Sequence, residues 1–331
     1  MPALALRLHD VDVDFDTAIP TFLEGCTLRG LSPKTVQFYA YALGPFAAHA
    51  REHGAEVLTA VTPPLVRSFL GRMQAQGATP RGGVGPGRLN DYAEAIRLFY
   101  DWAVAEGYSD HNPARGLPKA REGRKVIPTF SEDELRALLR QPDRSTFLGL
   151  RDHTFMLLLA DTGLRLSEAL GLQVADLHLS SGSAKVLGKG GRERLVGLSG
   201  ALARHLKHYL AMREATVRRA GCPAECLWLF PNQEGSRWNA KGAQMRLKLY
   251  GRQAGVTGVR VSPHTFRHTF AVWFVRNGGS AFHLQRILGH SDLTMTRRYC
   301  ELADTDALDR QRELSPLVTM NLAPTPGGRL R

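Results

Sequence analysis

The sequence predicts a mainly helical protein with two domains: a small all-helical domain, followed by a larger α+β domain with one small antiparallel sheet. Helical periodicity fills most of residues 32–107. Residues 108–128 lose this periodicity and contain several prolines and glycines, as linkers do. Helical segments then return, interrupted at residues 184–198 by a hairpin pattern. The length of 331 residues also suits two hydrophobic cores better than one.

The first helix of this pattern begins at a typical start signal. Ser32 suits an N-cap, and Pro33 suits the first helical turn. Apolar residues then recur at helical spacing until Gly44-Pro45, which interrupts the pattern. We therefore expect a kink or a new helix start before Gly54.

Two more helices complete the N-terminal domain. Thr62-Pro63 opens a helix with an apolar face, and a loop rich in glycine, proline and arginine follows at residues 77–87. A third helix carries apolar residues from Leu89 onward and stops near Gly107. This region is expected to form an independent helical core.

The segment between the two domains is basic. It contains Arg115, Lys119, Arg121, Arg124 and Lys125. Either it is a solvated, flexible connection, or it lies along a phosphate backbone as a strap; both interpretations remain open. The expected organisation is an extension (1–15), a helical domain (16–108), a linker (109–128), a second domain (129–314) and a tail (315–331).

The second domain opens with a capping box, Ser131-x-x-Glu134. Residues 151–161 form a largely apolar helix, which we expect at the centre of this core, and a short helix follows at 167–171. Two short strands flank the glycine-rich turn around Lys189. Later helices are expected from about Gly200, Asn239, Pro263, Ser280 and Glu301.

Composition points to an anionic partner. Lysine and arginine outnumber aspartate and glutamate by 43 to 31, a net charge of +12, and nucleic acid is the commonest partner of such proteins. The four cysteines show no zinc-site spacing. The acidic start does not resemble a signal peptide, and the longest apolar run, 155–160, is too short to span a membrane. We expect a cytoplasmic protein with reduced thiols.

Six separated residues form the candidate site. They are Arg165, Lys189, His264, Arg267, His290 and Tyr299. Each alone has an ordinary structural explanation; Arg165, for example, could pair with Glu168 three residues later. Together they could surround one anion with donors, because His264 and Arg267 share a face at a helix N-terminus. No cluster of acidic residues of the kind a metal-dependent nuclease needs is found, so we expect no metal and no other cofactor.

The chemistry that fits this set is attack on a phosphodiester. The arginines offer forked donors to the nonbridging oxygens, where negative charge grows in the transition state. A tyrosine hydroxyl is largely protonated at neutral pH, so Tyr299 needs a base, and a histidine could serve. A lysine on a mobile hairpin could protonate the departing 5′ oxygen.

The order and spacing of these motifs resemble those of the tyrosine recombinases, also called the phage integrase family. The resemblance covers residues 131–303 and rests on Thr162-Gly163-Leu164-Arg165, Gly188-Lys189-Gly190, His264-x-x-Arg267-His268, Leu288-Gly289-His290 and Tyr299. The helical N-terminal part is similar to the family's SAM-like core-binding domain. The resemblance therefore implies that the second domain has the DNA breaking-rejoining fold.

The resemblance also implies roles. Tyr299 would form a 3′-phosphotyrosine link, Arg165 and Arg267 would hold the scissile phosphate, and Lys189 would be the general acid. His264 would act as base and His290 would support the transition state, while Glu168 and His268 would support other site residues. Lys34, on the helix expected to lie on DNA, and the basic linker residues would contact double-stranded DNA.

By the same resemblance, four protomers, identical or mixed with a paralogue, would act on inverted-repeat sites through a Holliday junction. The compact two-domain form is similar to the Xer type, with integration, excision and dimer resolution all open. The alternatives are DNA relaxation of the type IB topoisomerase kind and a catalytically silent DNA-binding regulator. Intact candidate residues disfavour the regulator.

Overall fold

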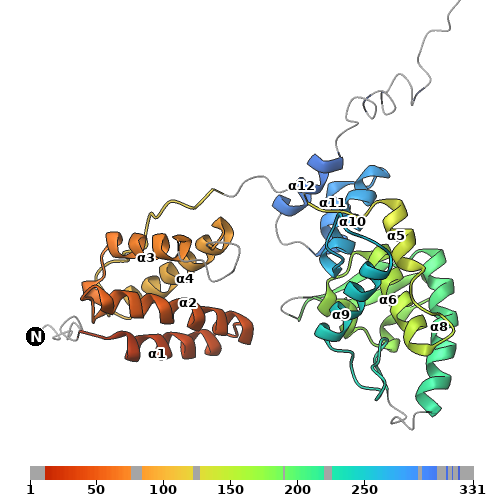
Figure 1. Cartoon of the computed structure of the whole chain (residues 1–331), viewed down its shortest axis with the longest axis horizontal. Helices are drawn as coiled ribbons and strands as arrows, with labels where there is room; N and C mark the ends of the chain where they lie inside the picture. Colours follow the sequence, from red (N-terminus) through yellow and green to blue (C-terminus); the bar gives the residue numbers. More distant parts are fainter. Residues whose placement is uncertain are drawn as a thin grey trace, which may run out of the picture. The chain divides into compact units, whose positions relative to one another are not determined.

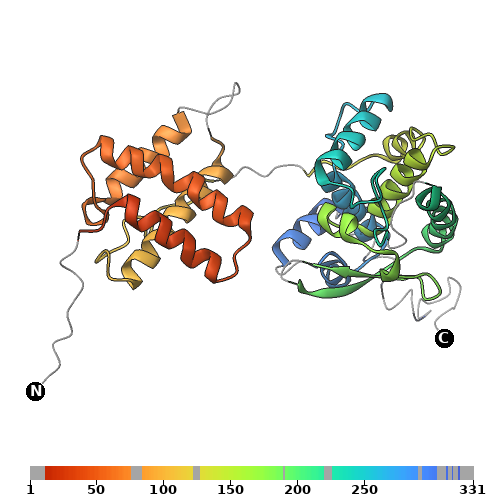
Figure 2. The same ribbon diagram turned by 90° about the horizontal axis from the view of Figure 1, so that it is seen from below.

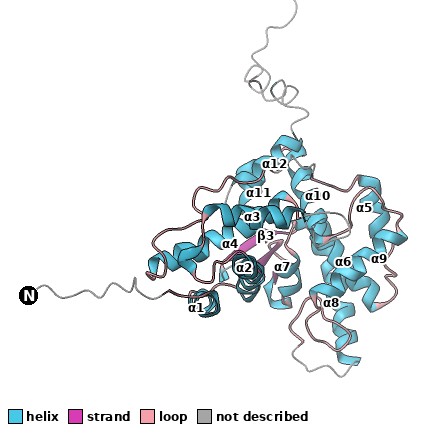
Figure 3. Ribbon diagram, turned by 60° about the vertical axis from the view of Figure 1, so that its left-hand side comes forward, coloured by secondary structure: helices cyan, strands magenta, loops and turns pink. Residues whose placement is uncertain are grey.

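The chain folds into two compact units, Met1–Lys125 and Val126–Arg331, and each is described by itself. The computed structural model describes residues 12–75, 84–121, 127–188, 191–219, 226–289 and 293–303, with residues 311, 315 and 320. Helices dominate both units, and a short antiparallel sheet belongs to the second, as the fold class predicted from the sequence requires (Figure 3). None of the described helices has the length and apolar character needed to cross a bilayer.

The described residues of the first unit contain four α-helices, which pack together (Figure 2). They are α1 (Phe15–Leu28), α2 (Pro33–Glu52), α3 (Pro63–Ala75) and α4 (Pro86–Ala105). Their core is aromatic: Phe22 packs edge-on against Phe99 with ring centroids 5.5 Å apart, and Phe46 packs against Phe69 at 5.3 Å. Edge-to-face pairs of this kind add to the free energy gained by burying the rings.

Helix α1 was not predicted from the sequence. Asp14 caps it, and its buried residues Phe15, Ala18, Phe22 and Cys26 recur at helical spacing. Val13 and Phe15 are buried, so the ordered unit begins before residue 16. The pattern was therefore present in the sequence, although Pro20 inside the helix obscures it.

A kink or a new helix start was expected at Gly44-Pro45. The new start is wrong, because α2 continues through both residues, and the kink stays a prediction. Gly44 and Pro45 are exposed, whereas Ala42, Leu43, Phe46 and Ala47 beside them are buried. Burial of one complete helical face stabilises the helix by more than the hydrogen bond that a proline removes.

The predicted linker is partly docked on the first unit. Asn90 of α4 accepts a hydrogen bond from the Ala120 amide at 2.8 Å and donates one to the Ala120 carbonyl at 3.0 Å. Asn112 donates to the Arg97 carbonyl at 2.9 Å, and Ala114 is buried in the core. Residues 109–121 therefore extend the first unit.

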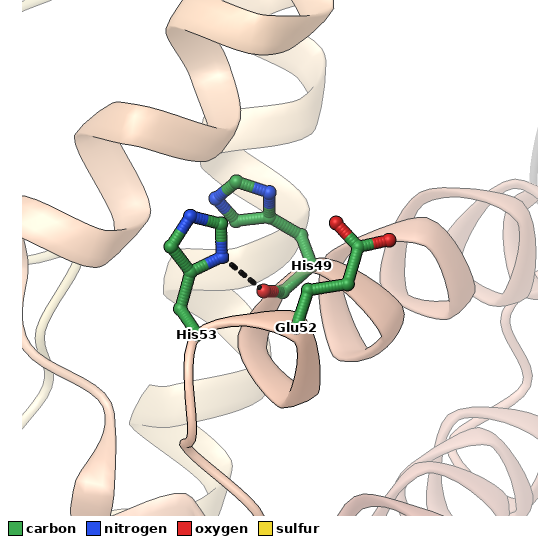
Figure 4. Close-up of side chains that lie close together, drawn as sticks. All are labelled: His49, Glu52 and His53. Atoms are coloured by element: carbon green, nitrogen blue, oxygen red, sulfur yellow. Dashed lines mark hydrogen bonds between the residues drawn. The ribbon is translucent and has the colours of Figure 1, made fainter.

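The last turn of α2 and its C-cap residue form a polar cluster of His49, Glu52 and His53 (Figure 4). Its ligand atoms lie within 4.8 Å of one another, close enough to hold a metal ion. Arg72 of α3, however, forms an ion pair with Glu52 and lies 3.4 Å from Nδ1 of His49, while Nε2 of His49 bonds Ser68 at 2.8 Å. The Arg72 guanidinium thus already provides the positive charge beside these three side chains.

The second unit is built around α6 (Phe147–Thr162), which is buried along most of its length. It packs against α5 (Glu132–Leu139), α7 (Leu166–Gly171), α8 (Gly200–Arg219) and α10 (Pro263–Arg276). The predicted capping box of Ser131 and Glu134 is present at the start of α5. The remaining helices are α9 (Ala240–Gln253), α11 (Ala281–Leu288) and α12 (Leu293–Ala303). Most of the helix expected at residues 301–314 lies outside the described residues.

The sheet has three antiparallel strands in the order β1-β2-β3. The predicted hairpin is β2 (Ser183–Leu187) and β3 (Glu193–Gly197), with Ser183 opposite Gly197 and Leu187 opposite Glu193. Strand β1 (Leu177–His178) has only two residues, too few to show an alternating pattern, and was missed.

Candidate active site

The first part of the site is the turn after α6. Gly163 ends that helix in the left-handed conformation, with φ of 61°. A Cβ at this position would lie 2.5 Å from Cδ1 of Phe270 and 2.9 Å from Cδ2 of Leu288, so the turn requires glycine. Two residues later, Arg165 occupies the N-cap position of α7.

Glu168 fixes Arg165 in place. Its carboxylate accepts hydrogen bonds from the Arg165 backbone amide and from its Nη1, both at 2.9 Å. The Arg165 guanidinium also donates to the carbonyls of Leu288 and Gly289, each at 3.3 Å, at the end of α11. The Arg165 side chain remains 36% exposed, which leaves it able to reach a ligand.

A second arginine, Arg194 of β3, holds the same carboxylate. Its Nη1 and Nη2 donate to the two oxygens of Glu168 at 3.0 and 2.8 Å, and its Nε donates to the Ile287 carbonyl at 2.9 Å. Burial raises the pKa of Glu168, but hydrogen bonds from Arg194 and from the Arg165 amide outweigh it, so the pKa lies below its ordinary value. Glu168 is therefore ionised at neutral pH.

Arg194 was missed from the sequence. Strand alternation places it on the same face as the buried Val196, and a charged residue at an inward strand position signals a buried ionic partner. That signal was available once the hairpin was predicted. The partner, Glu168, was predicted to support the site.

Arg267 lies on α10 and is 5% exposed. Its guanidinium donates to the carbonyls of Gly163 at 2.9 Å and of Leu288 at 2.8 Å. Burial, and then the positive charge of Arg165, lower the pKa of Arg267 to about 10, so it is still a cation at neutral pH. Two neighbouring guanidinium groups thus form a positively charged site suited to an oxyanion.

Tyr299 approaches these two arginines from α12, which packs against α10 and α11 (Figure 1). Its side chain is 1% exposed. Burial raises the pKa of the Tyr299 phenol above its ordinary value, while the positive charges of Arg267 and Arg165 oppose that rise. A buried, neutral phenol beside two arginines can act as a nucleophile once a base removes its proton.

The imidazole that contacts this phenol belongs to His268. Its Nδ1 lies 2.7 Å from the Tyr299 hydroxyl oxygen. His264, expected from the family resemblance to act as the base, is exposed one helical turn earlier and stacks on His268 with ring centroids 6.4 Å apart. The structure therefore brings together Arg165, Glu168, Arg267, His268 and Tyr299, with His264 at the edge.

Four predicted residues lie outside the described residues: Lys189, His290, Arg124 and Lys125. The backbone beside Lys189 is described, and the Gly188 amide donates to the Arg192 carbonyl at 2.7 Å where the hairpin opens. The other predicted DNA contacts, Lys34, Arg115, Lys119 and Arg121, are exposed side chains of the first unit.

Comparison with known proteins decides the family. A model described as the phage integrase family matches residues 128–306. The chain is 31% identical over 297 residues to tyrosine recombinase XerC of Proteus mirabilis, covering 89% of this chain and 92% of that protein. The chain belongs to the phage integrase family. It is a tyrosine site-specific recombinase of the Xer-like type.

A second relative agrees with this assignment, and two solved structures share the fold. The recombinase is 28% identical over 289 residues to tyrosine recombinase XerD of Staphylococcus aureus, covering 87% of this chain and 94% of the relative. The fold matches that of the XerH site-specific recombinase with a TM-score of 0.70 at 20% identity, over 89% and 83% of the two chains. It matches the Tn1549 transposon integrase with a TM-score of 0.70 at 16% identity, over 89% and 98%.

Proposed function

We propose that this recombinase cuts and rejoins double-stranded DNA through a 3′-phosphotyrosine at Tyr299. The observation that supports this proposal is the convergence of Arg165, Arg267 and Tyr299 from three separate segments of the chain. Two guanidinium groups beside a buried phenol can bind a scissile phosphate and present a nucleophile to its phosphorus.

In this mechanism the arginines bind the nonbridging oxygens and stabilise the charge that grows on them in the transition state. Tyr299 displaces the 5′ oxygen, which takes a proton from Lys189, and His290 supports the transition state. The phosphotyrosine bond preserves the energy of the phosphodiester, so the free 5′ hydroxyl of a partner strand can reseal it without ATP.

The proposed substrate is a specific DNA site with inverted repeats. The solved structure of XerH contains its difH substrate, and that of the Tn1549 integrase contains a circular intermediate DNA. The net charge of +12 suits a polyanion. The exposed residues Lys34, Arg115, Lys119 and Arg121 would contact the phosphate backbone.

We further propose that four protomers, identical or mixed with a paralogue, pair two sites and exchange strands through a Holliday junction. The arrangement of the two sites would then decide the outcome. Sites in direct repeat lead to excision or dimer resolution, and sites on separate molecules lead to integration.

The test uses purified protein in EDTA with nicked duplexes tiled across the DNA that flanks its gene. An SDS-resistant adduct that forms with the wild type and not with Tyr299→Phe is expected, and the reacting duplex identifies the site. Crosslinking on paired sites should then yield tetramers and a four-way junction. An adduct that persists in Tyr299→Phe would disprove the nucleophile, and relaxation of plasmids without any site would favour topoisomerase activity.

A further inference from the structure

The Tyr299 hydroxyl and the His268 imidazole form a direct pair inside the second unit. Nδ1 of His268 lies 2.7 Å from the hydroxyl oxygen, and the ring centroids are 5.7 Å apart. The two residues come from α10 and α12, helices that pack against each other. A base must be within hydrogen-bonding distance of the proton that it removes, and His268 meets this condition before any substrate is bound.

The surroundings of His268 keep it neutral. Burial, and then its neighbours His264 and Arg267 on the same helix, lower the pKa of His268 to about 4. From the other elements, Tyr299 of α12 faces it, and Arg165 contributes positive charge at the phenol. A neutral imidazole has one nitrogen with a free lone pair, so Nδ1 can accept the phenol hydrogen when the ring proton is on Nε2.

We propose that His268, rather than His264, accepts the proton of Tyr299 during DNA cleavage. This inference rests on the proposed function. As the Tyr299 oxygen forms its bond to phosphorus, the phenol proton moves to Nδ1 of His268, and the bond from phosphorus to the 5′ oxygen breaks. That oxygen takes its proton from the separate acid, Lys189. In rejoining, the His268 imidazolium returns the proton to the departing phenolate.

Substrate binding would strengthen this base. The positive charge of Arg267 is one of the causes that lower the pKa of His268. A phosphate bound to Arg267 neutralises part of that charge, and the pKa of His268 then rises toward its ordinary value. The imidazole therefore becomes a better proton acceptor when the scissile phosphate is bound. When no phosphate is bound, the buried phenol stays protonated.

The test compares His268→Asn with the matched variant His264→Asn, one turn earlier on the same helix. An asparagine oxygen takes the place of Nδ1 and can accept a hydrogen bond, but it does not accept the proton. His268→Asn should therefore slow adduct formation by about 10²-fold or more and make its rate depend on pH, whereas any slowing in His264→Asn should leave the pH profile unchanged. Normal thermal unfolding and gel shift would show that His268→Asn still folds and binds DNA.

Two further measurements separate a base from a merely structural residue. In a duplex with a 5′-bridging phosphorothiolate, the sulfur leaves without an acid, so this duplex should rescue Lys189→Ala and should not rescue His268→Asn. The cleavage rate of the wild type should be nearly level from pH 7 to 8, where the His268 imidazole is mostly neutral even at its ordinary pKa. The rate of His268→Asn should rise about tenfold per pH unit, because solvent must then generate the phenolate.

A histidine tautomer measurement tests the proposal without relying on activity. In ¹⁵N-histidine NMR of the wild-type chain, His268 should show its proton on Nε2 and a free lone pair on Nδ1. A proton on Nδ1, or normal cleavage by His268→Asn, would overturn the proposal and leave Tyr299 as nucleophile. A pH-dependent defect found only in His264→Asn would assign the base to His264. Absence of any adduct with the wild type would instead contradict the proposed function.

Discussion

Arg194 holds the carboxylate of Glu168 with two hydrogen bonds, of 3.0 and 2.8 Å. The same carboxylate binds Arg165, one of the two arginines proposed to hold the phosphate. Because Arg194 belongs to β3, the hairpin that carries Lys189 is connected through two ion pairs to Arg165. Strand β3 and the arginines proposed to bind the phosphate are therefore coupled through Glu168.

Arg194→Gln should destabilise the second unit by about 3 kcal/mol, because it removes one partner of a largely buried ion pair. DNA cleavage should fall together with this loss, since Arg165 becomes less constrained. Urea unfolding and adduct assays would measure both effects. In a double-mutant cycle with Glu168→Gln, the two destabilisations should sum to more than that of the double variant; strict additivity would contradict the coupling.

Glu168 should also make the second unit sensitive to acid. Its pKa in the folded chain is held below the ordinary value of 4.5, despite burial, by hydrogen bonds from Arg194 and the Arg165 amide. The stabilisation is therefore complete above pH 4.5 and is lost as the pH falls through the lower, folded-state pKa. Unfolding free energies measured between pH 6 and 3 should fall more steeply for the wild type than for Glu168→Gln. Parallel curves would refute this assignment.

Gly163→Ala should lower the stability of the second unit by about 2–5 kcal/mol, because alanine disfavours the positive φ and its Cβ would overlap Phe270 and Leu288. Gly44→Ala is the matched control. Gly44 lies inside α2 with no atom near the place of an added Cβ, so this change should stabilise the first unit by about 0.5–1 kcal/mol. Thermal unfolding would measure both changes, and equal shifts would contradict the structural distinction.

Asn90→Ala should release residues near Ala120 from the first unit, because it removes both hydrogen bonds to the Ala120 backbone. We expect faster hydrogen exchange at the Ala120 amide and faster trypsin cleavage after Lys119 and Arg121. Asn232→Ala, in the second unit, is a control that should leave both rates unchanged. Unchanged exchange at Ala120 in Asn90→Ala would show that other contacts hold this segment.

Local signals explain most of what could be predicted from the sequence. Caps at Ser32, Ser131, Asn239 and Ser280 are short-range hydrogen bonds, and all four start helices as expected. The new helix start expected at Gly44-Pro45 is wrong because that expectation considered only local propensity, whereas packing of the buried face decides whether the helix continues.

The site was predictable only in part, for a physical reason. Charged and nucleophilic side chains are visible in a sequence, but the carbonyls that hold Arg267 are backbone atoms, 104 and 21 residues away in the chain. Which of two neighbouring histidines meets Tyr299 depends on the rotation of α10 against α12, which sequence spacing does not specify. His264 and His268 are one helical turn apart, so the sequence alone could not show which of them contacts Tyr299.

The acceptors around the two proposed phosphate-binding arginines include three main-chain carbonyls, those of Gly163, Leu288 and Gly289. A substitution changes a side chain and leaves the main-chain carbonyl in place. Saturation mutagenesis would therefore not detect these acceptors through the loss of a polar side chain. It would reveal them at Gly163 and Gly289, where the backbone adopts φ values of 61° and 63°. If no substitution is tolerated at these two glycines, their intolerance would indicate that the backbone around the two arginines must keep its conformation. A search for new recombinases could then use the two glycines as diagnostic positions.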